Sequence, residues 1–523
     1  MLWGSNARET HPIYFHHVLK GIRNGAPLYV VDPRRTSSAQ WADCWLGLDV
    51  GTDITLANAI GREILAEGLE NRQFIEHATS RFEEYQAAVE PFTLEFAERE
   101  TGVPKGAIRD LAHAYAQAPT AQLCWTLGIT EHHKGVDNVL ALINLALLTG
   151  HVGRYGSGLC PLRGQNNVQG GGDMGALPDR LTGFQHVAND ECRAKFEAAW
   201  NCTIPPTPGR HISGMFKAME AGDLKTLYVL GENPVGSEPD TQHVLSILKK
   251  LDFMVVQDLF LTQTAEIADV VLPASAGWAE SEGTVTSSER KVQRVRRAVE
   301  LLPGTKDDLA ILFDLANRLG HDWGEPNPRA LWDELRTVSP MHAGMSYERL
   351  EALGGIRWPC YDEDHPGELF LHGRLWANPR IGPRAPFSVV LPEAPVDRLD
   401  DDFPIRLTTG RRLDAYNTGV QTGAYASPLR RQEAVDISPE DAAQFGLEED
   451  EQVRISSRRG TVVAPVRLDP GLRPGLAFMT MHAPDEVNTN ELTIEAIDPK
   501  SGVSEFKATA IRIDKISSAS AGD

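Results

Sequence analysis

The chain has 523 residues, of which 41% are hydrophobic and 24% are charged, the ordinary balance of a globular protein. That length allows three or four domains. The 72 acidic residues outnumber the 51 basic residues and give a formal charge of −21. Because such a surface repels phosphate backbones, the charge argues against general nucleic-acid binding, although it permits a local positive site for a small anion.

Cysteine usage indicates a reducing compartment. The six cysteines stand at positions 44, 124, 160, 192, 202 and 360, without a C-x-x-C pair and without the spacing of a zinc or iron–sulfur site. We expect free thiols, with Cys44, Cys124 and Cys202 as small buried hydrophobic residues. No signal segment or twin-arginine leader is recognisable, and the apolar run from Val139 is too short to cross a bilayer. The sequence therefore predicts a cytoplasmic protein without a membrane span.

Helices and strands alternate over the first 160 residues. Apolar periodicity and end signals predict helices over 11–25, 50–68, 103–119 and 135–150, and strands over 26–32 and 121–128. Thr52 or Asp53 is the expected N-cap of the second helix. This alternation predicts a parallel sheet with helices on both faces.

The same pattern returns with strands predicted over 224–234, 252–258 and 267–275. Polar residues follow these strands, as they follow the strand at 26–32. Ligands bind at the carboxyl ends of strands in open α/β sheets, so four such ends predict a large polar ligand lying across two domains. The polar ends are Asp32-Pro33-Arg34, Gly231-Glu232-Asn233-Pro234, Gln257-Asp258 and Pro273-Ala274-Ser275.

After residue 278 the sequence no longer shows the regular alternation of strands and helices. Residues 278–300 are interpreted as an irregular segment followed by an extended basic stretch, 307–320 as a helix, and 358–403 as a proline-rich crossing. Short strands are predicted over 404–410, 451–469, 475–481 and 507–515, with a short helix capped by Ser438, and together they indicate a β-barrel-like domain. The expected domains are 1–165, 166–278, 279–394 and 395–523, the third being an irregular connecting region.

The segment "CPLRGQNNVQGGGDMG", residues 160–175, places one permanent positive charge, Arg163, among amide side chains and glycines. A loop that wraps around an anion would have this composition. An ordinary solvent-exposed loop is the alternative.

"LRGQNNVQGGGDMGALPD" resembles the signature of molybdenum- or tungsten-dependent formate dehydrogenases, which bind bis-(molybdopterin guanine dinucleotide). Similar segments continue in order along most of the chain, among them "GSNARETHP", "NGAPLYVVDPRRT", "LYVLGENP", "ESEGTVTSSERKVQRV" and "MTMHAPDEVNTNELT". The resemblance implies two Rossmann-like domains and a C-terminal β-barrel-like domain, with formate as substrate and an electron-transfer partner. It also implies that Arg163 anchors formate, since a guanidinium can hold a carboxylate by two parallel hydrogen bonds.

The resemblance further implies a set of cofactor-binding residues at the strand ends and in the last domain. Asp308 could instead cap the helix that begins there. The implied residues are Gly4, Ser5, Asn6, Asp32, Pro33, Arg34, Asp53, Gly164, Gln165, Gly231, Glu232, Asn233, Gln257, Asp258, Asp308, Arg411, Tyr416, Thr418, Asn490 and Lys507.

Two features depart from the family pattern. The pair His132-His133 has no suitably spaced partner for a metal and is interpreted as structural or surface, and Cys160 is not expected to bind metal. Segments matching the family's four cluster cysteines, its lysine and its metal-bound Cys-His or selenocysteine-His pair are not recognised. We therefore expect neither metal nor iron–sulfur ligands here, an exposed sheet edge at Leu2–Trp3, and no formate oxidation by this chain alone. The alternative function is a non-catalytic molybdopterin-binding module or a degenerate subunit.

Overall fold

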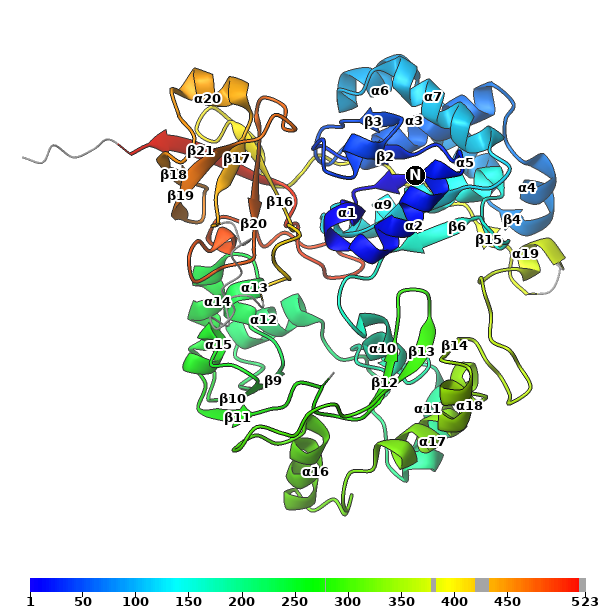
Figure 1. Ribbon diagram of the computed structural model, residues 1–523, viewed down its shortest axis with the longest axis vertical. Coiled ribbons are helices and arrows are strands. Elements are labelled where there is room, and N and C mark those ends of the chain that lie inside the picture. The colour runs from blue at the N-terminus through cyan, green and yellow to red at the C-terminus, as the bar shows by residue number, and fades with distance from the viewer. Residues whose placement is uncertain (278, 378–381, 419–431, 517–523) are drawn as a thin grey trace, which may run out of the picture. The chain divides into compact units, whose positions relative to one another are not determined.

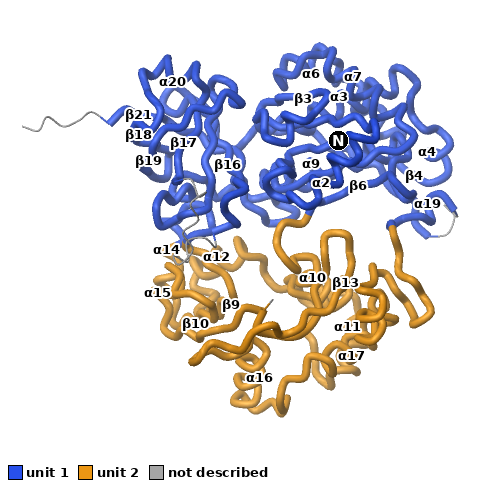
Figure 2. Tube along the Cα trace, viewed as in Figure 1, with its two compact units in different colours: residues 1–162, 236–244, 370–523 blue, residues 163–235, 245–369 orange. Residues whose placement is uncertain are grey.

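A computed structural model describes residues 1–277, 279–377, 382–418 and 432–516 of the chain (Figure 1). The described residues form two compact units (Figure 2). Unit 1 comprises residues 1–162, 236–244 and 370–523, and unit 2 comprises residues 163–235 and 245–369. The four-domain division expected from the sequence stays a prediction.

Unit 1 begins with a five-stranded parallel sheet of order β3-β2-β1-β5-β6. Its strands are β1 Leu2–Trp3, β2 Tyr29–Val31, β3 Cys44–Leu46, β5 Gln122–Trp125 and β6 Gly158–Pro161. The expectation that Leu2–Trp3 forms an exposed edge is wrong. Leu2 pairs with Val30 on one side and with Cys124 on the other, so β1 is the central strand and both of its side chains are buried.

Helices cover both faces of this sheet, as predicted. Because side chains alternate along a strand, Leu2 and Val30 pack in one apolar cluster with Phe15 of α2, whereas Trp3 and Val31 pack in another with helices such as α3 and α9. The helices before β6 are α1 Ala7–Thr10, α2 Pro12–Arg23, η1 Ala39–Trp41, α3 Asp53–Ala66, α4 Arg72–Ala78, α5 Phe82–Val89, α6 Leu94–Thr101, α7 Lys105–Gln117, α8 Leu127–Thr130 and α9 Gly135–Thr149.

The later part of unit 1 contains a closed barrel of order β16-β20-β17-β19-β18-β21, which confirms the predicted barrel. Alternate apolar side chains such as Leu407, Val435 and Ile455 fill its interior. Ser438 caps α20 through a 3.0 Å hydrogen bond from the Asp441 amide, also as predicted. The elements are β16 Ile405–Gly410, β17 Val435–Ile437, α20 Pro439–Phe445, β18 Gln452–Ser456, β19 Thr461–Leu468, β20 Leu476–Thr480, η4 Thr489–Glu491 and β21 Thr509–Lys515. The crossing before the barrel contains α19 Arg374–Ala377 and β15 Ala385–Pro386, and β15 pairs with β4 Thr79–Ser80.

Unit 2 contains a three-stranded parallel sheet of order β11-β10-β9. Within residues 279–300, the part expected to be irregular contains β12, whereas the basic stretch expected to be extended forms β13. The two strands pair antiparallel, and β14 extends them. The strands are β9 Thr226–Leu230, β10 Phe253–Asp258, β11 Val270–Pro273, β12 Gly283–Thr286, β13 Lys291–Val295 and β14 Ile356–Arg357, with the short pair β7 Arg180–Leu181 and β8 Gln185–His186.

Several helices belong to unit 2, some of them with side-chain caps, and α13 and α14 extend into residues 236–244 of unit 1. Asp307, and not Asp308, caps α16, because the Asp307 carboxylate accepts the Leu309 amide at 2.9 Å. These helices are α10 Val168–Asp173, α11 Asp190–Trp200, α12 Ile212–Glu220, α13 Pro234–Ser237, α14 Thr241–Leu248, α15 Gln263–Glu266, α16 Asp308–Arg318, α17 Pro328–Val338, η2 Pro340–His342 and α18 Tyr347–Ala352. Within the described ranges, no helix combines the length and apolarity needed to span a bilayer.

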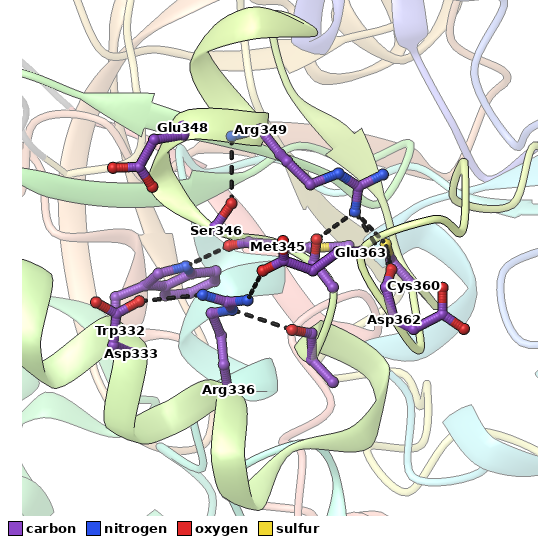
Figure 3. A network of polar contacts seen from close by, with 12 residues as sticks. Trp332, Asp333, Arg336, Met345, Ser346, Glu348, Arg349, Cys360, Asp362 and Glu363 are labelled. Carbon is purple, nitrogen blue, oxygen red and sulfur yellow. Dashed lines mark hydrogen bonds and ion pairs between the residues drawn. The ribbon is translucent and has the colours of Figure 1, made fainter.

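Two arginines hold the irregular segments of unit 2 in place (Figure 3). Arg336 of α17 donates to the Ala343 carbonyl at 3.0 Å and to the Glu363 carboxylate at 2.7 Å. Arg349 of α18 donates to the His365 carbonyl at 2.8 Å, and its guanidinium lies 3.4 Å from the Cys360 sulfur. These bonds satisfy loop carbonyls that no sheet or helix pairs, so the residues around Cys360 serve the fold.

Candidate active site

The loop after β1 depends on two glycines in contact. Gly4 has a φ of +57°, its amide donates to the Val31 carbonyl at 2.8 Å, and its carbonyl accepts the Thr126 hydroxyl at 2.8 Å. A Cβ on Gly4 would lie 2.8 Å from the carbonyl carbon of Gly128. Glycine at position 4 therefore lets the loops after β1 and β5 meet at the carboxyl edge of the sheet.

Ser5 and Asn6 follow in the same loop and carry buried polar atoms. The Asn6 Oδ1 accepts from the Ser38 amide at 3.2 Å and from the Ser38 hydroxyl at 3.0 Å, which fixes the orientation of the amide group. Ser5 Oγ and Asn6 Nδ2 have no hydrogen-bond partner among the described residues. Buried polar atoms in this state are rare, so both are available to a ligand.

Asp32 and Arg34 lie where β2 ends. The Asp32 carboxylate accepts the Arg34 amide at 3.0 Å, and burial raises the pKa of Asp32 to about 6. The Arg34 guanidinium lies 3.4 Å from the centre of the Phe478 ring, and its Nε is buried without a partner in the described part of the chain. Pro33 between them is half-buried. This strand end thus combines a proton-binding carboxylate with a cation fixed against the barrel.

Asp53 is the first residue of α3, and its carboxylate accepts the Trp3 indole N–H at 2.8 Å. Burial raises the pKa of Asp53, and the neighbouring His132 partly offsets that effect. Thr52 holds the N-cap position but makes no capping bond with its side chain; its hydroxyl donates to the Asp49 carbonyl at 2.6 Å. Thr52 is thus the N-cap, one of the two residues expected there, although its side chain does not cap the helix, and Asp53 joins α3 to the central strand.

The pair His132-His133 joins the sheet to the C-terminal segment. The Nε2 of His132 pairs with the Gly128 carbonyl at 3.1 Å, and His133 hydrogen-bonds the buried Glu505 carboxylate through both its ring and its amide. Lys507 donates to the Thr409 carbonyl at 3.1 Å and forms an ion pair with Glu131 at 2.7 Å. These contacts give both histidines structural partners, in line with their interpretation from sequence.

The second sheet places Asn233 and Gln257 in fully formed hydrogen-bond networks. The Asn233 amide donates to the Gln263 side chain at 2.6 Å and accepts the Thr264 hydroxyl at 2.7 Å. The buried Gln257 accepts the Tyr228 hydroxyl at 2.5 Å and donates to Asp308 at 2.5 Å. These bonds fix the shape of the strand ends around Gly231, whose amide donates to the Gln257 carbonyl.

Three carboxylates lie close together at the carboxyl ends of the strands of the second sheet, the second edge. Removal from water raises the pKa of Glu232, Asp258 and Asp308, and the negative charge of Asp258 raises the pKa of the other two further. The Asp258 carboxylate also accepts the Phe260 amide at 3.1 Å. Like charges held close together at a strand end favour a ligand that donates hydrogen bonds.

Arg163 begins unit 2 and is anchored by a chain of side chains. Its Nε donates to the Gln169 side chain at 3.2 Å, and Gln169 donates to the buried Asp173 carboxylate at 2.9 Å. Asp173 also accepts the Trp358 indole N–H at 2.8 Å, and burial raises its pKa to about 6. Gly164 is half-buried and Gln165 exposed in the following turn. The guanidinium is therefore oriented by groups of α10 and of the segment after β14.

The predicted residues of the C-terminal segment differ in exposure. Asn490 is buried; it donates to the Gly236 carbonyl at 3.1 Å and accepts the Thr493 hydroxyl at 3.0 Å. Tyr416 is exposed, whereas Arg411 and Thr418 are half-buried in the loop after β16. The buried His482 accepts the Arg412 amide at 2.9 Å and pairs with the Asn417 carbonyl at 2.6 Å, which fixes that loop.

Several residues that position these groups were not predicted. Trp3, Tyr228, Gln263 and Trp358 act through side-chain bonds to partners at least 29 residues away in the chain. Asp173 stands within the quoted signature, and its four-residue spacing from Gln169 on a helix could have indicated their contact. Cys202, expected to be buried, is exposed.

Comparison with known proteins agrees with this arrangement. A sequence profile of the molybdopterin oxidoreductase family matches residues 1–318, and a profile of the molybdopterin dinucleotide binding domain matches residues 405–510. The chain is 38% identical over 521 residues to the F420-dependent formate dehydrogenase subunit alpha of Methanocaldococcus jannaschii, covering 99% of this chain and 76% of that protein. It is 36% identical over 521 residues to formate dehydrogenase H of Escherichia coli, covering 98% and 72%.

Among solved structures, acetylene hydratase from Pelobacter acetylenicus has the same fold, with a TM-score of 0.72 over 98% of this chain and 77% of that one. At 19% sequence identity this likeness concerns the fold alone. The profile matches and the formate dehydrogenase relatives together show that the chain belongs to the molybdopterin oxidoreductase family.

Proposed function

We propose that the chain is the catalytic subunit of a formate dehydrogenase, which converts formate to CO2 with release of one proton and two electrons. The observation that carries this proposal is the anchored arginine: Arg163 is held through Gln169 by the buried Asp173. A guanidinium fixed in this way can orient a carboxylate by parallel hydrogen bonds. Relatives with 36% and 38% identity are formate dehydrogenases, which supports the choice of substrate.

We propose bis-(molybdopterin guanine dinucleotide) with molybdenum or tungsten as the cofactor. The first sheet fits such a group, because Ser5 Oγ, Asn6 Nδ2 and Arg34 Nε are buried without partners among the described residues. The hydroxyl and amide donors can bind phosphate or ribose oxygens, and the carboxylates of the second edge can accept hydrogen bonds from a guanine. When bound, this cofactor supplies the centre that takes up the two electrons of formate.

The residues proposed to hold the cofactor fall into three groups. The first edge contributes Gly4, Ser5, Asn6, Asp32, Pro33, Arg34 and Asp53; the second contributes Gly231, Glu232, Asn233, Gln257, Asp258 and Asp308; and the loops contribute Gly164, Gln165, Arg411, Tyr416, Thr418, Asn490 and Lys507. Among these, Asn490 and Lys507 already bond within the protein, so their part would be to shape the loops around the ligand.

We further propose that the electrons leave to a separate partner protein or subunit and that the enzyme works in the cytoplasm. All six cysteines are free thiols, which is typical of proteins in a reducing compartment.

Replacing Arg163 by lysine tests the function. In the enzyme purified from its natural source with its cofactor bound, Arg163→Lys keeps the positive charge but loses the planar guanidinium, whose N–H donors can bind both oxygens of a carboxylate. We expect kcat/KM for formate-dependent reduction of a viologen dye to fall by about 100-fold, with unchanged metal content by elemental analysis.

Arg297→Lys is the matched control, because Arg297 is an exposed arginine of the same unit that pairs with Glu300. It should keep both activity and metal. Full activity of Arg163→Lys would refute the proposed role. Parallel loss of metal and activity would mean that Arg163 holds the cofactor and not the substrate. A metal-loaded wild-type enzyme without formate oxidation would favour a non-catalytic module.

A further inference from the structure

Two cysteines face each other across neighbouring strands of the first sheet. Cys124 of β5 and Cys160 of β6 are direct partners in the parallel ladder. Directly opposed residues point to the same face of a sheet, and adjacent strands lie about 4.8 Å apart. A disulfide needs Cα atoms about 4.4 to 6.8 Å apart, so this register lies within range. Among the described strands, no other two cysteines are paired in this way.

The surroundings of the pair favour thiol chemistry. Both cysteines belong to the apolar cluster between the sheet and α2, where the Cys124 sulfur lies 3.0 Å from the Tyr14 hydroxyl. Cys124 is buried, whereas Cys160 is partly exposed. A hydrogen bond from Cys160 lowers the pKa of Cys124 to about 7, and the same interaction raises the pKa of Cys160. The interaction favours a thiolate on Cys124 beside a thiol on Cys160, which are the two species that disulfide formation requires.

We propose that Cys124 and Cys160 form a reversible disulfide modification site that a small hydroperoxide oxidises. The thiolate attacks a peroxide oxygen and breaks the O–O bond, which yields a sulfenic acid and, after protonation, one water. The second sulfur then attacks the sulfenic sulfur and displaces a second water. Overall, two thiols and one hydrogen peroxide give one disulfide and two waters. A small oxidant is required because the pair is largely covered by protein.

The proposed bond is reversible. A disulfide brings its two Cβ atoms to about 3.8 Å, so its formation would draw β5 and β6 together locally, and a dithiol can reduce it again by thiol–disulfide exchange. It would tie β5 to β6 immediately before the loop of Arg163. The Leu162 amide already donates to the Trp125 carbonyl at 2.9 Å there, and the cross-link would add a covalent constraint to that contact.

Peptide mapping of the full chain tests the site. The reduced protein is treated with hydrogen peroxide, blocked with N-ethylmaleimide and digested without reductant. We expect a peptide pair linked through Cys124 and Cys160 by mass spectrometry, a several-fold fall in alkylation of both residues, and full recovery of alkylation after dithiothreitol.

Two variants sharpen the result. Cys160→Ser should abolish the linked peptide, with circular dichroism reporting whether the fold is kept, and Cys202→Ser, which removes an exposed cysteine outside the pair, should leave the linked peptide unchanged. If Cys202 in the wild-type protein is oxidised while Cys124 and Cys160 remain fully alkylated, the proposal is wrong. Linkage of Cys124 to any other cysteine would also overturn it.

Discussion

The carboxyl edges of the two parallel sheets follow one topological rule but differ in chemistry. At the first edge, Asp32 and Asp53 are buried, and each is bound by a single defined donor, the Arg34 amide or the Trp3 indole. At the second edge, Glu232, Asp258 and Asp308 are more open, and the charge of Asp258 raises the pKa of both Glu232 and Asp308. At the first edge, the main unfavourable effect on the carboxylates is thus their removal from water, and each is held by one donor. At the second edge, like charges lie close together, and a ligand that donates hydrogen bonds would reduce their repulsion.

The largest difference between the edges should appear when one donor is removed from each. Trp3→Phe takes the indole N–H from the buried Asp53 carboxylate and leaves a cavity, so we expect a loss of about 3 kcal/mol in the free energy of unfolding. Tyr228→Phe removes only the hydroxyl bound to Gln257 from a half-open position and should cost about 1 kcal/mol. Urea unfolding of both variants measures the difference, and equal losses would contradict a more rigid first edge.

Asp32→Asn tests the desolvation cost at the first edge through its pH dependence. Burial raises the folded-state pKa of Asp32 from 3.8 to about 6, so the folded protein binds this proton more tightly than the unfolded chain. The contribution of Asp32 to the free energy of unfolding therefore falls as pH rises from about 4 to about 6.

The Asn variant lacks this titration, so we expect it to be more stable than wild type by about 3 kcal/mol at pH 8 and equally stable near pH 4. Asp401→Asn, at an exposed aspartate of the same unit, is the control. A variant less stable than wild type at pH 8 would show that the Asp32 charge stabilises the fold.

Asp258→Asn should have the smallest effect. It removes one negative charge beside Glu232 and Asp308 while keeping an oxygen that can accept the Phe260 amide. We expect a gain of less than about 1 kcal/mol at pH 7, because the cluster is partly hydrated. Asp252→Asn, at the other end of β10 and exposed, provides the reference in the same thermal unfolding experiment. A marked loss of stability would mean that the second edge is not strained by its charges.

The sequence alone determined many of the strands and the polar residues that follow some of them. Apolar runs with turn residues after them located β2, β9, β10 and β11, and the residues after them do lie at the carboxyl ends of parallel strands. Short strand-like runs also located β16, β18, β19, β20 and β21 of the barrel, although not β17, and Ser438 before Pro439 marked the start of α20. These predictions succeeded because strand propensity, side-chain alternation and capping act over a few neighbouring residues.

Only the tertiary structure decided which partners each polar residue received. The central position of β1, the bond of Trp3 to Asp53 and the bond of His133 to Glu505 join residues 28 to 372 positions apart. The same holds for the Arg34 guanidinium on Phe478 and for the facing thiols of Cys124 and Cys160. Such pairs arise from sheet order and from the packing of the barrel, which depend on the burial of whole faces, so no local pattern in the chain specifies them.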